Sequence, residues 1–306
     1  MTATEVHSST EQTTNHNRGD RITMTILVTG ATGTVGRHVV GQLVAAGQDV
    51  RALTTRDPTT VGLPPQVQVV QGNLAQPETL SAALDGVDRV HLFPVADAAG
   101  GFVDAAKAAG VRRVVVFSSE VVAHPKAFAK FSVEHHRAVE QVVEGGGFEW
   151  TVLRPTGFAA NTLEWASSIA EEGVVRSPYP HAAQALIHEA DIAAVAVRAL
   201  TETGHHGQRY LLTGPEAITK VDQVTAISGA IGREIRFEEV SPEQWRALMV
   251  QYMPEFIVDM LLGHWAHADA EPETVDPTLI RILGRPAFTF AQWAIDHQDD
   301  FTLPNP

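Results

Sequence analysis

The chain has 306 residues, a length that fits one large α/β domain with a smaller appended lobe. Its 36 acidic residues outnumber its 22 basic ones, which argues against a nucleic-acid-binding surface. It contains no cysteine, so disulfides, thiolate metal sites and a cysteine nucleophile are excluded, and no apolar run is long enough for a membrane span. We expect a cytoplasmic monomer or homodimer without nucleic-acid or membrane partners.

The first residues differ in composition from the rest of the chain. Residues 1–21 are polar, rich in Thr, Ser, Gln and Asn, and lack the apolar segment of a signal peptide. We expect them to form a disordered tail. Met24 stands directly before the first apolar run and is therefore a candidate for the true translation start.

Apolar runs of strand length alternate with segments of helical period through the first half of the chain, a pattern typical of a doubly wound parallel sheet. The predicted strands cover residues 25–29, 49–53, 66–70, 87–93, 111–119 and 149–155. The predicted helices between them cover residues 34–46, 77–84, 102–109 and 129–144. The later elements are less regular: a helix at 189–200, a strand at 208–214, and helices within 219–232 and 241–253.

This pattern predicts a Rossmann-type α/β fold with a smaller mixed α/β C-terminal lobe. We expect an NAD(P)-binding domain over residues 22–155. Residues 156–306 are expected to form a substrate-binding lobe that is interleaved with the sheet.

A glycine-rich loop follows the first predicted strand. Gly30, Gly33 and Gly36 have G-x-x-G-x-x-G spacing at the junction of that strand and the first helix. The first glycine permits a tight turn, the second lets the backbone approach a pyrophosphate, and the third lets the helix pack on the strand. The loop therefore predicts a dinucleotide site, and no Gly-Lys-Ser/Thr follows that would indicate a mononucleotide P-loop. Three further loop residues are expected to contact the cofactor: Thr32, Thr34 and Val35.

The end of the second predicted strand distinguishes between cofactors. An acid there would bind the adenosine ribose 2′-OH of NAD, whereas an arginine suits the 2′-phosphate of NADP. The segment reads VRALTTRDP, with Arg51 and Arg56 and no acid before Asp57. We therefore expect NADP(H) in preference to NAD(H).

Five segments together resemble the NmrA-like branch of the atypical short-chain dehydrogenases/reductases. They are TGATGTVG (29–36), VRALTTRDP (50–58), GNLAQPETL (72–80), VVVFSS (114–119) and VEQVVEGGGFEWTVLRPTGFAAN (139–161). The resemblance covers about residues 24–215. It implies NAD(P) bound across the carboxyl ends of the strands. That branch includes NADP-dependent quinone and phenylpropanoid reductases as well as non-catalytic redox sensors.

The resemblance also implies positions for individual residues. Asn73, followed by Leu74, takes the place of the usual Asp beside the adenine, and Phe93 with Pro94 lies near the ribose. The segment RPTGF lies beside the nicotinamide, so that four residues line the pocket: Pro155, Thr156, Gly157 and Phe158.

The tyrosine and lysine of the ordinary short-chain dehydrogenase mechanism are missing. The three tyrosines and the residues four positions beyond them are Tyr179 and Ala183, Tyr210 and Gly214, and Tyr252 and Phe256. By register with the family, the lysine position falls on His136 and the tyrosine position on Ser132. We consider His136 as the proton donor, with solvated imidazoles on a helix surface as the alternative. Adjacent helix positions point about 100° apart, so at most one of His135 and His136 faces the cleft.

Two serines end the fifth predicted strand at its carboxyl end, where ligands of open α/β sheets bind. We expect Ser118 to contact the cofactor and Ser119 to hydrogen-bond the acceptor. Residues 245–265 are rich in Trp, Met and Phe, which indicates a lobe core or a roomy apolar substrate pocket. The two histidines of HWAH (264–267) have no nearby acidic partner pattern, and we expect no metal site.

These observations predict an NADP(H)-dependent oxidoreductase that transfers a hydride to a small apolar quinone, enone, imine or carbonyl compound. Two alternatives remain at this point. One is a non-catalytic NADP(H)-binding redox sensor, favoured by the missing tyrosine and lysine. The other is a non-redox isomerase or cyclase on the same fold.

Overall fold

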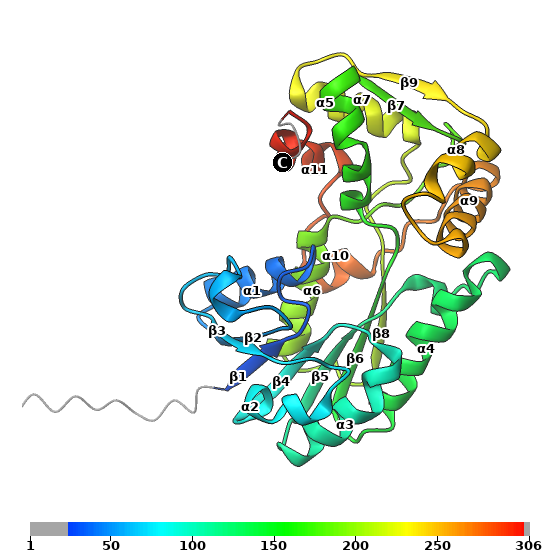
Figure 1. Ribbon diagram of the computed structural model, residues 1–306. Helices are drawn as coiled ribbons and strands as arrows, with labels where there is room; N and C mark the ends of the chain where they lie inside the picture. Colours follow the sequence, from blue (N-terminus) through cyan, green and yellow to red (C-terminus); the bar gives the residue numbers. More distant parts are fainter. Residues whose placement is uncertain (1–23, 303–306) are drawn as a thin grey trace, which may run out of the picture.

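The computed structural model of the protein describes residues 24–302 (Figure 1). The tail expected at residues 1–21 lies outside these residues. Seven parallel strands form the central sheet in the order β3-β2-β1-β4-β5-β6-β8. They are β1 (Thr25–Val28), β2 (Asp49–Thr54), β3 (Gln68–Gln71), β4 (Val87–Leu92), β5 (Arg113–Phe117), β6 (Glu149–Pro155) and β8 (Gln208–Leu212). The expected Rossmann-type doubly wound sheet is confirmed.

Helices cover both faces of the sheet, which explains why both faces of its strands carry buried apolar residues. In β5, Val115 and Phe117 face one layer while Val114 and Val116 face the other. The first layer consists of α1 (Gly36–Ala45), α6 (Glu189–Thr201) and α10 (Thr278–Leu283). The second consists of α2 (Ser81–Leu84), α3 (Ala99–Ala108) and α4 (Lys130–Glu144).

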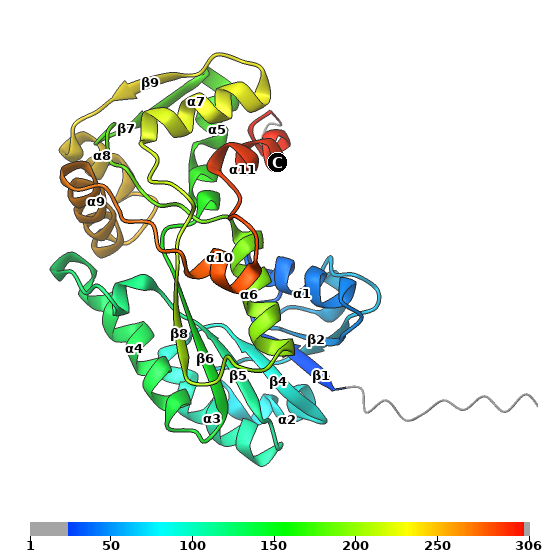
Figure 2. The ribbon, with the colours of Figure 1, turned by 180° about the vertical axis from the view of Figure 1, so that it is seen from behind.

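A C-terminal lobe lies beyond the carboxyl ends of the strands (Figure 2). Its two parallel strands are β7 (Val174–Ser177) and β9 (Arg236–Glu239). Its helices are α5 (Ala166–Glu172), α7 (Lys220–Ile231), α8 (Pro242–Met249), α9 (Glu255–Ala270) and α11 (Phe290–Asp296). The lobe has two apolar cores of its own, one around Ile169, Ile227 and Trp293, the other around Trp245 and Trp265. Within residues 24–302, no helix combines the length and apolar character that crossing a bilayer requires.

The chain passes between sheet and lobe several times. It leaves the sheet after β6 through a 3₁₀ segment (Ala159–Trp165), returns as α6 and β8, and leaves again into α7. It returns once more as α10, which packs on α6, before α11 completes the lobe. The predicted boundary after residue 155 coincides with the first departure from the sheet, and three later elements, α6, β8 and α10, still belong to the sheet layers.

Several predicted element boundaries need correction. The strand predicted over 111–119 ends at Phe117, because the side chain of Ser119 accepts a hydrogen bond from the Val121 N–H and starts a 3₁₀ turn. The helix predicted over 77–84 is a 3₁₀ turn (Pro77–Thr79) followed by the short α2. The helix predicted over 102–109 begins earlier, at Ala99.

A buried ion pair holds α4 against the sheet. Arg154 of β6 donates from Nε and Nη2 to the two carboxylate oxygens of Glu140 of α4, at 3.0 and 2.5 Å. The hydroxyl of Ser118 donates to Oε1 of the same carboxylate at 2.5 Å. Glu140 is only 3% exposed, so these bonds replace its lost hydration.

Replacing Arg154 by Ala leaves the carboxylate of Glu140 buried without its cation. We expect the free energy of unfolding to fall by about 3–5 kcal/mol, measured by urea denaturation. Arg236→Ala is the control, because it breaks an exposed ion pair with Glu238 and leaves the free energy of unfolding nearly unchanged. Equal stabilities of the two variants would contradict the structural role of Arg154.

Candidate active site

The glycine loop brings the start of α1 into close contact with the end of β1. Gly30 has a φ of +63°, a backbone conformation that glycine adopts without strain. A Cβ on Gly36 would lie 2.0 Å from the carbonyl oxygen of Gly30, so only glycine allows this approach. No side chain caps the N-terminus of α1, and no acid lies in its first turn. The loop therefore offers backbone N–H groups and a positive helix end to an anion, as a dinucleotide diphosphate requires.

The residues after β4 pack on this loop. The side chain of Phe93 lies against Gly30, where an added Cβ would be 3.1 Å from the Cβ of Phe93. The ring of Phe93 also stacks on Phe117 at the end of β5, with 6.4 Å between ring centroids. Thr29 supports the turn because its hydroxyl accepts from the Phe93 N–H at 2.7 Å. Phe93 and Pro94 consequently lie between the glycine loop and the carboxyl end of β5.

The structure gives Arg51 a role other than the expected one. Its register partner in β1 is Leu27, so it lies in the middle of β2 and not at the carboxyl end. Its guanidinium donates from Nη1 to carbonyl oxygens at the C-terminal end of α2, including those of Ala83 at 2.9 Å and Asp85 at 2.7 Å. Arg51 thus stabilises α2, where the carbonyl groups lack helical partners.

Arg56, by contrast, lies two residues beyond β2, at the edge that carries the glycine loop. It is exposed, and its backbone N–H is fixed by the hydroxyl of Thr54 at 3.1 Å. An arginine that the sequence analysis did not select, Arg37, lies on α1 and donates to the loop carbonyls of Gly33 and Thr32, at 3.3 and 3.1 Å. Its position in α1 follows the third glycine directly, which is the signal that could have identified it.

The other expected cofactor residues also lie at the carboxyl edge of the sheet. Asn73 follows β3, and its side-chain oxygen accepts from the N–H of Ala75 at 3.0 Å. The side chain of Leu74 packs into the core, which leaves only its backbone for the expected contact with a cofactor. Thr156 follows β6 and donates to the carbonyl of Ala185 at 2.7 Å. The remaining expected residues of this loop and edge are Thr32, Thr34 and Val35 at the start of α1, and Pro155, Gly157 and Phe158 after β6.

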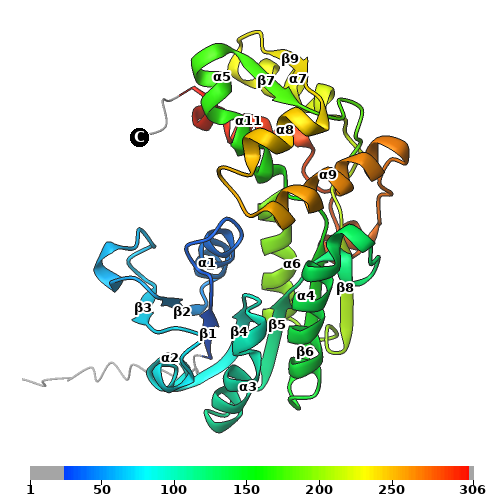
Figure 3. The ribbon, with the colours of Figure 1, turned by 45° about the vertical axis from the view of Figure 1, so that its right-hand side comes forward.

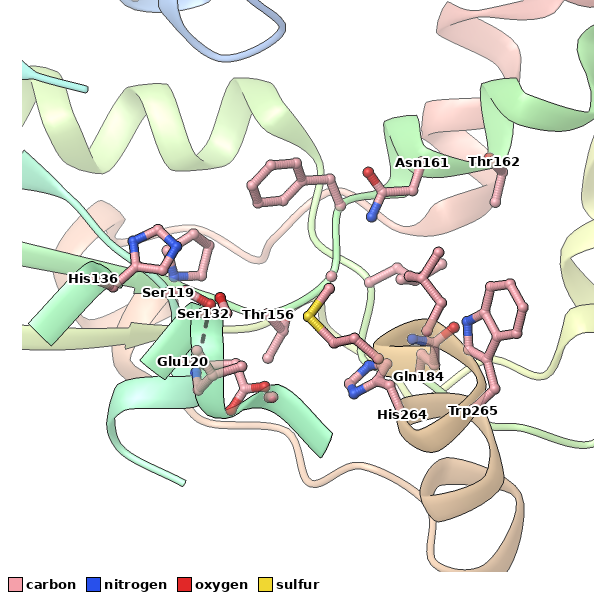
Figure 4. Close-up of a pocket in the computed structure, with 18 of the residues that line it drawn as sticks. Ser119, Glu120, Ser132, His136, Thr156, Asn161, Thr162, Gln184, His264 and Trp265 are labelled. Atoms are coloured by element: carbon pink, nitrogen blue, oxygen red, sulfur yellow. Dashed lines mark hydrogen bonds between the residues drawn. The ribbon is translucent and has the colours of Figure 1, made fainter. Parts of the chain in front are cut away.

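A cavity of about 560 Å³ lies between this edge and the lobe (Figure 4). Figure 3 shows the backbone of the sheet domain and of the lobe from the side. Its sheet side is formed by the ends of β4, β5 and β6 together with α4. Its lobe side is formed by α7, α9 and the 3₁₀ segment after β6. The residues from the sheet side include Phe93, Pro94, Phe117, Ser118, Ser119, Ser132, His136, Pro155, Thr156, Gly157 and Phe158. The expected residues on α4 and after β4, β5 and β6 therefore lie around one cavity, whereas those of the glycine loop, of β2 and after β2 and β3 do not line it.

Of the two adjacent histidines on α4, only His136 lines the cavity. The ring of His135 instead lies 3.3 Å from the Pro94 carbonyl oxygen and stacks on Phe131. Burial, reinforced by the charge of His135, lowers the pKa of His136 to about 4. Its Nδ1 has no hydrogen-bond partner among residues 24–302. His136 is thus a neutral imidazole at neutral pH, which suits a hydrogen bond to a ligand better than proton donation.

The lobe contributes titratable residues that the sequence analysis missed. Lys220 of α7 donates to Ser177 Oγ at 2.8 Å and to the Pro178 carbonyl at 2.9 Å, and lies over the ring of Trp265. Burial lowers the pKa of Lys220 to about 7 and raises that of Glu164 to about 6. These residues are distant in sequence from the glycine loop, and no local motif marks them.

On the sheet side, Glu120 follows Ser119, and burial, with the charge of Glu273, raises the pKa of Glu120.

The tryptophan- and methionine-rich segment 245–265 contributes both to a lobe core and to the lining of the cavity. Trp245 packs in a lobe core, while Met260, Leu261 and Trp265 line the cavity. Among residues 24–302, no three His, Asp or Glu side chains are grouped so as to hold a metal ion.

Together, a doubly wound parallel sheet, a glycine loop at an uncapped helix N-terminus and a cavity beside it define a dinucleotide-binding Rossmann protein. A family model described as NAD(P)H-binding matches residues 30–203. The chain belongs to this NAD(P)H-binding family, and the expected resemblance to NmrA-like, atypical short-chain dehydrogenases/reductases is confirmed.

Curated relatives cover nearly the whole chain. It is 41% identical to a (4-alkanoyl-5-oxo-2,5-dihydrofuran-3-yl)methyl phosphate reductase of Streptomyces griseus, over 90% of this chain and 99% of that protein. It is 35% identical to an NAD(P)H azoreductase of Xenophilus azovorans, over 90% and 99% of the two chains. A solved NADPH-dependent quinone oxidoreductase of Escherichia coli is 26% identical, with a TM-score of 0.74 over 88% of this chain and 98% of that one. The same enzyme has been solved in complex with NADPH.

Replacing Gly36 by Ala places a Cβ 2.0 Å from the carbonyl oxygen of Gly30, which is too close for the backbone to keep its position. We expect the loop to be displaced and the Kd for NADPH to rise by about tenfold or more, about 1.4 kcal/mol, measured by NADPH fluorescence titration. Gly41→Ala in the same helix is the matched control, since its added Cβ meets nothing within 4 Å. It is expected to bind NADPH as the wild type does. Unchanged NADPH affinity of Gly36→Ala would refute this role of the loop.

Proposed function

We propose that this protein is an NADPH-dependent reductase that reduces a conjugated double bond in a small, largely apolar acceptor. The observation that carries this proposal is the cavity of about 560 Å³, which extends from the carboxyl ends of β4 to β6 to the apolar side chains of α9. A site of this shape holds an acceptor beside a dinucleotide bound along the sheet edge. The named activities of the relatives support it, because all three are reductases of conjugated compounds.

The charges that line the cavity favour an uncharged acceptor. Glu120 and Glu164 both face it, and the amine of Lys220 is already hydrogen-bonded to the lobe. A phosphate ester, as in the name of the Streptomyces relative, would meet these two carboxyl groups, while the cations that line the cavity are already engaged, Lys220 by Ser177 and His264 by Glu273. We therefore propose a quinone, an enone or an azo compound without an anionic group as the substrate class.

The cofactor site fits NADPH in its backbone geometry and its charges. The glycine loop and the N-terminus of α1 would hold the diphosphate, and Arg56 the 2′-phosphate. Asn73 would contact the adenine, Phe93 and Pro94 the ribose, and the segment from Pro155 to Phe158 the nicotinamide. When bound, NADPH supplies the hydride. His136 and Ser119 would position the bound molecules by hydrogen bonds, with His136 neutral.

The test follows the absorbance of NADPH during incubation with a panel of uncharged quinones, enones, imines and azo compounds. We expect turnover with at least one of them, and the rate to depend on both NADPH and acceptor. Tight NADPH binding without turnover on the whole panel would overturn the reductase proposal and favour a redox sensor or a non-redox activity.

The cytoplasmic location and the monomeric or homodimeric state stay predictions.

Replacing Arg56 by Ala tests the preference for NADPH. We expect a loss of about 1.5–3 kcal/mol, as for a hydrogen bond to a charged group, that is, a rise of about 10- to 150-fold in the Kd for NADPH with little change for NADH. Arg51→Ala is the control, because its guanidinium binds α2; it is expected to lower stability without changing the ratio of the two affinities. A wild-type protein that binds NADH more tightly than NADPH would contradict the proposed preference.

A further inference from the structure

His264 lies on the wall between two cavities. It lines the main cavity together with Trp265 from the same helix, α9 (Figure 4). It also lines a second cavity of about 280 Å³ on the other side of that wall. Glu120, Phe128 and Thr156 border both cavities as well. A ring in this position can exchange a proton with a molecule in either space.

A carboxylate orients the ring of His264. Nε2 of His264 lies 3.0 Å from Oε1 of Glu273. The other carboxylate oxygen of Glu273 accepts from the N–H of Ala185 at 2.8 Å. Ala185 in turn accepts from the hydroxyl of Thr156, the residue that follows β6. The dyad of His264 and Glu273 is therefore tied by hydrogen bonds to the sheet edge at which the cofactor is proposed to bind.

The charged surroundings of His264 favour its protonated form. Burial disfavours the imidazolium, but the hydrogen bond and charge of Glu273, with the charge of Glu120, outweigh it, and the pKa of His264 is raised. Lys220 of α7 opposes this effect. The titratable groups around the second cavity also include His124, Lys126, His267 and Glu271. His264 thus differs from His136, which lines the same cavity but is neutral and has no carboxylate hydrogen-bonded to it among residues 24–302.

We propose that His264 is the proton donor of the reduction. Glu273 orients its ring, and water in the second cavity reprotonates it. This inference rests on the proposed reductase function. One atom of the acceptor double bond takes a hydride from NADPH, and the other atom takes the proton of His264. The imidazole is left neutral and regains a proton from water, so that the net reaction consumes NADPH and one proton. This assignment replaces the tyrosine that the chain lacks with a side chain from the lobe.

Replacing His264 by Gln removes the proton but keeps a polar side chain. With the acceptor that the wild type reduces fastest, we expect kcat/KM at pH 7 to fall by about 100-fold or more, with unchanged NADPH affinity. The wild-type pH profile of kcat/KM is expected to fall as pH rises through the raised pKa of His264, and this descending limb is absent in His264→Gln. Wild-type rates and an unchanged pH profile in His264→Gln would overturn the assignment.

Two further variants separate catalysis from folding. His181→Gln is the control and is expected to keep wild-type kcat/KM, since His181 is exposed and lines neither of the two cavities. Glu273→Gln removes the charge that raises the pKa of His264, so its descending limb is expected to move to lower pH. If His264→Gln fails to fold, as judged by circular dichroism, Glu273→Gln becomes the deciding variant. A pH profile of kcat/KM that descends at the same pH as in the wild type would then refute the assignment. Absence of wild-type turnover on the acceptor panel refutes the proposed function itself.

Discussion

The close approach of Gly36 to the carbonyl of Gly30 is the contact on which the rest of the site depends. Because neither residue has a side chain, α1 starts directly beside the end of β1, and its N-terminus remains free for a ligand. The same turn leaves room for Phe93, which packs on Gly30 and stacks on Phe117. The aromatic pair then forms part of the cavity wall. This one backbone contact therefore places the glycine loop next to the cavity proposed for the acceptor.

Much of the sheet domain was predictable because its signals are local. Each strand is a short segment rich in apolar residues, because both faces of the sheet are covered, and such segments are easy to recognise. The glycine loop is likewise contained in a single turn between a strand and a helix. Arg51 shows the limit of such signals. Its place in the sequence beside Arg56 resembles that of a cofactor residue, but the register of β2 places it in mid-strand against the carbonyl groups of α2.

The substrate side of the cavity was less predictable, because it depends on contacts between distant segments. Glu164, Lys220 and His264 come from three different lobe elements, and each lies more than a hundred residues from the glycine loop. Sequence periodicity identified the helices that carry Lys220 and Trp245, but it does not show which helix face meets the sheet edge. The partner of His264, Glu273, lies beyond the end of α9, where helical spacing gives no information. The electrostatic difference between His136 and His264 likewise follows from the three-dimensional packing alone.

The repeated passage of the chain between sheet and lobe has a consequence for how such proteins diversify. A lobe that is encoded as one continuous segment can be exchanged between genes as a cassette. Here α6, β8 and α10 of the sheet layers are encoded between lobe elements, so cutting out the lobe would also remove parts of the sheet. New acceptor specificities are therefore expected to arise by point substitutions on the cavity faces of α7 and α9, within a chain whose two parts are inherited together.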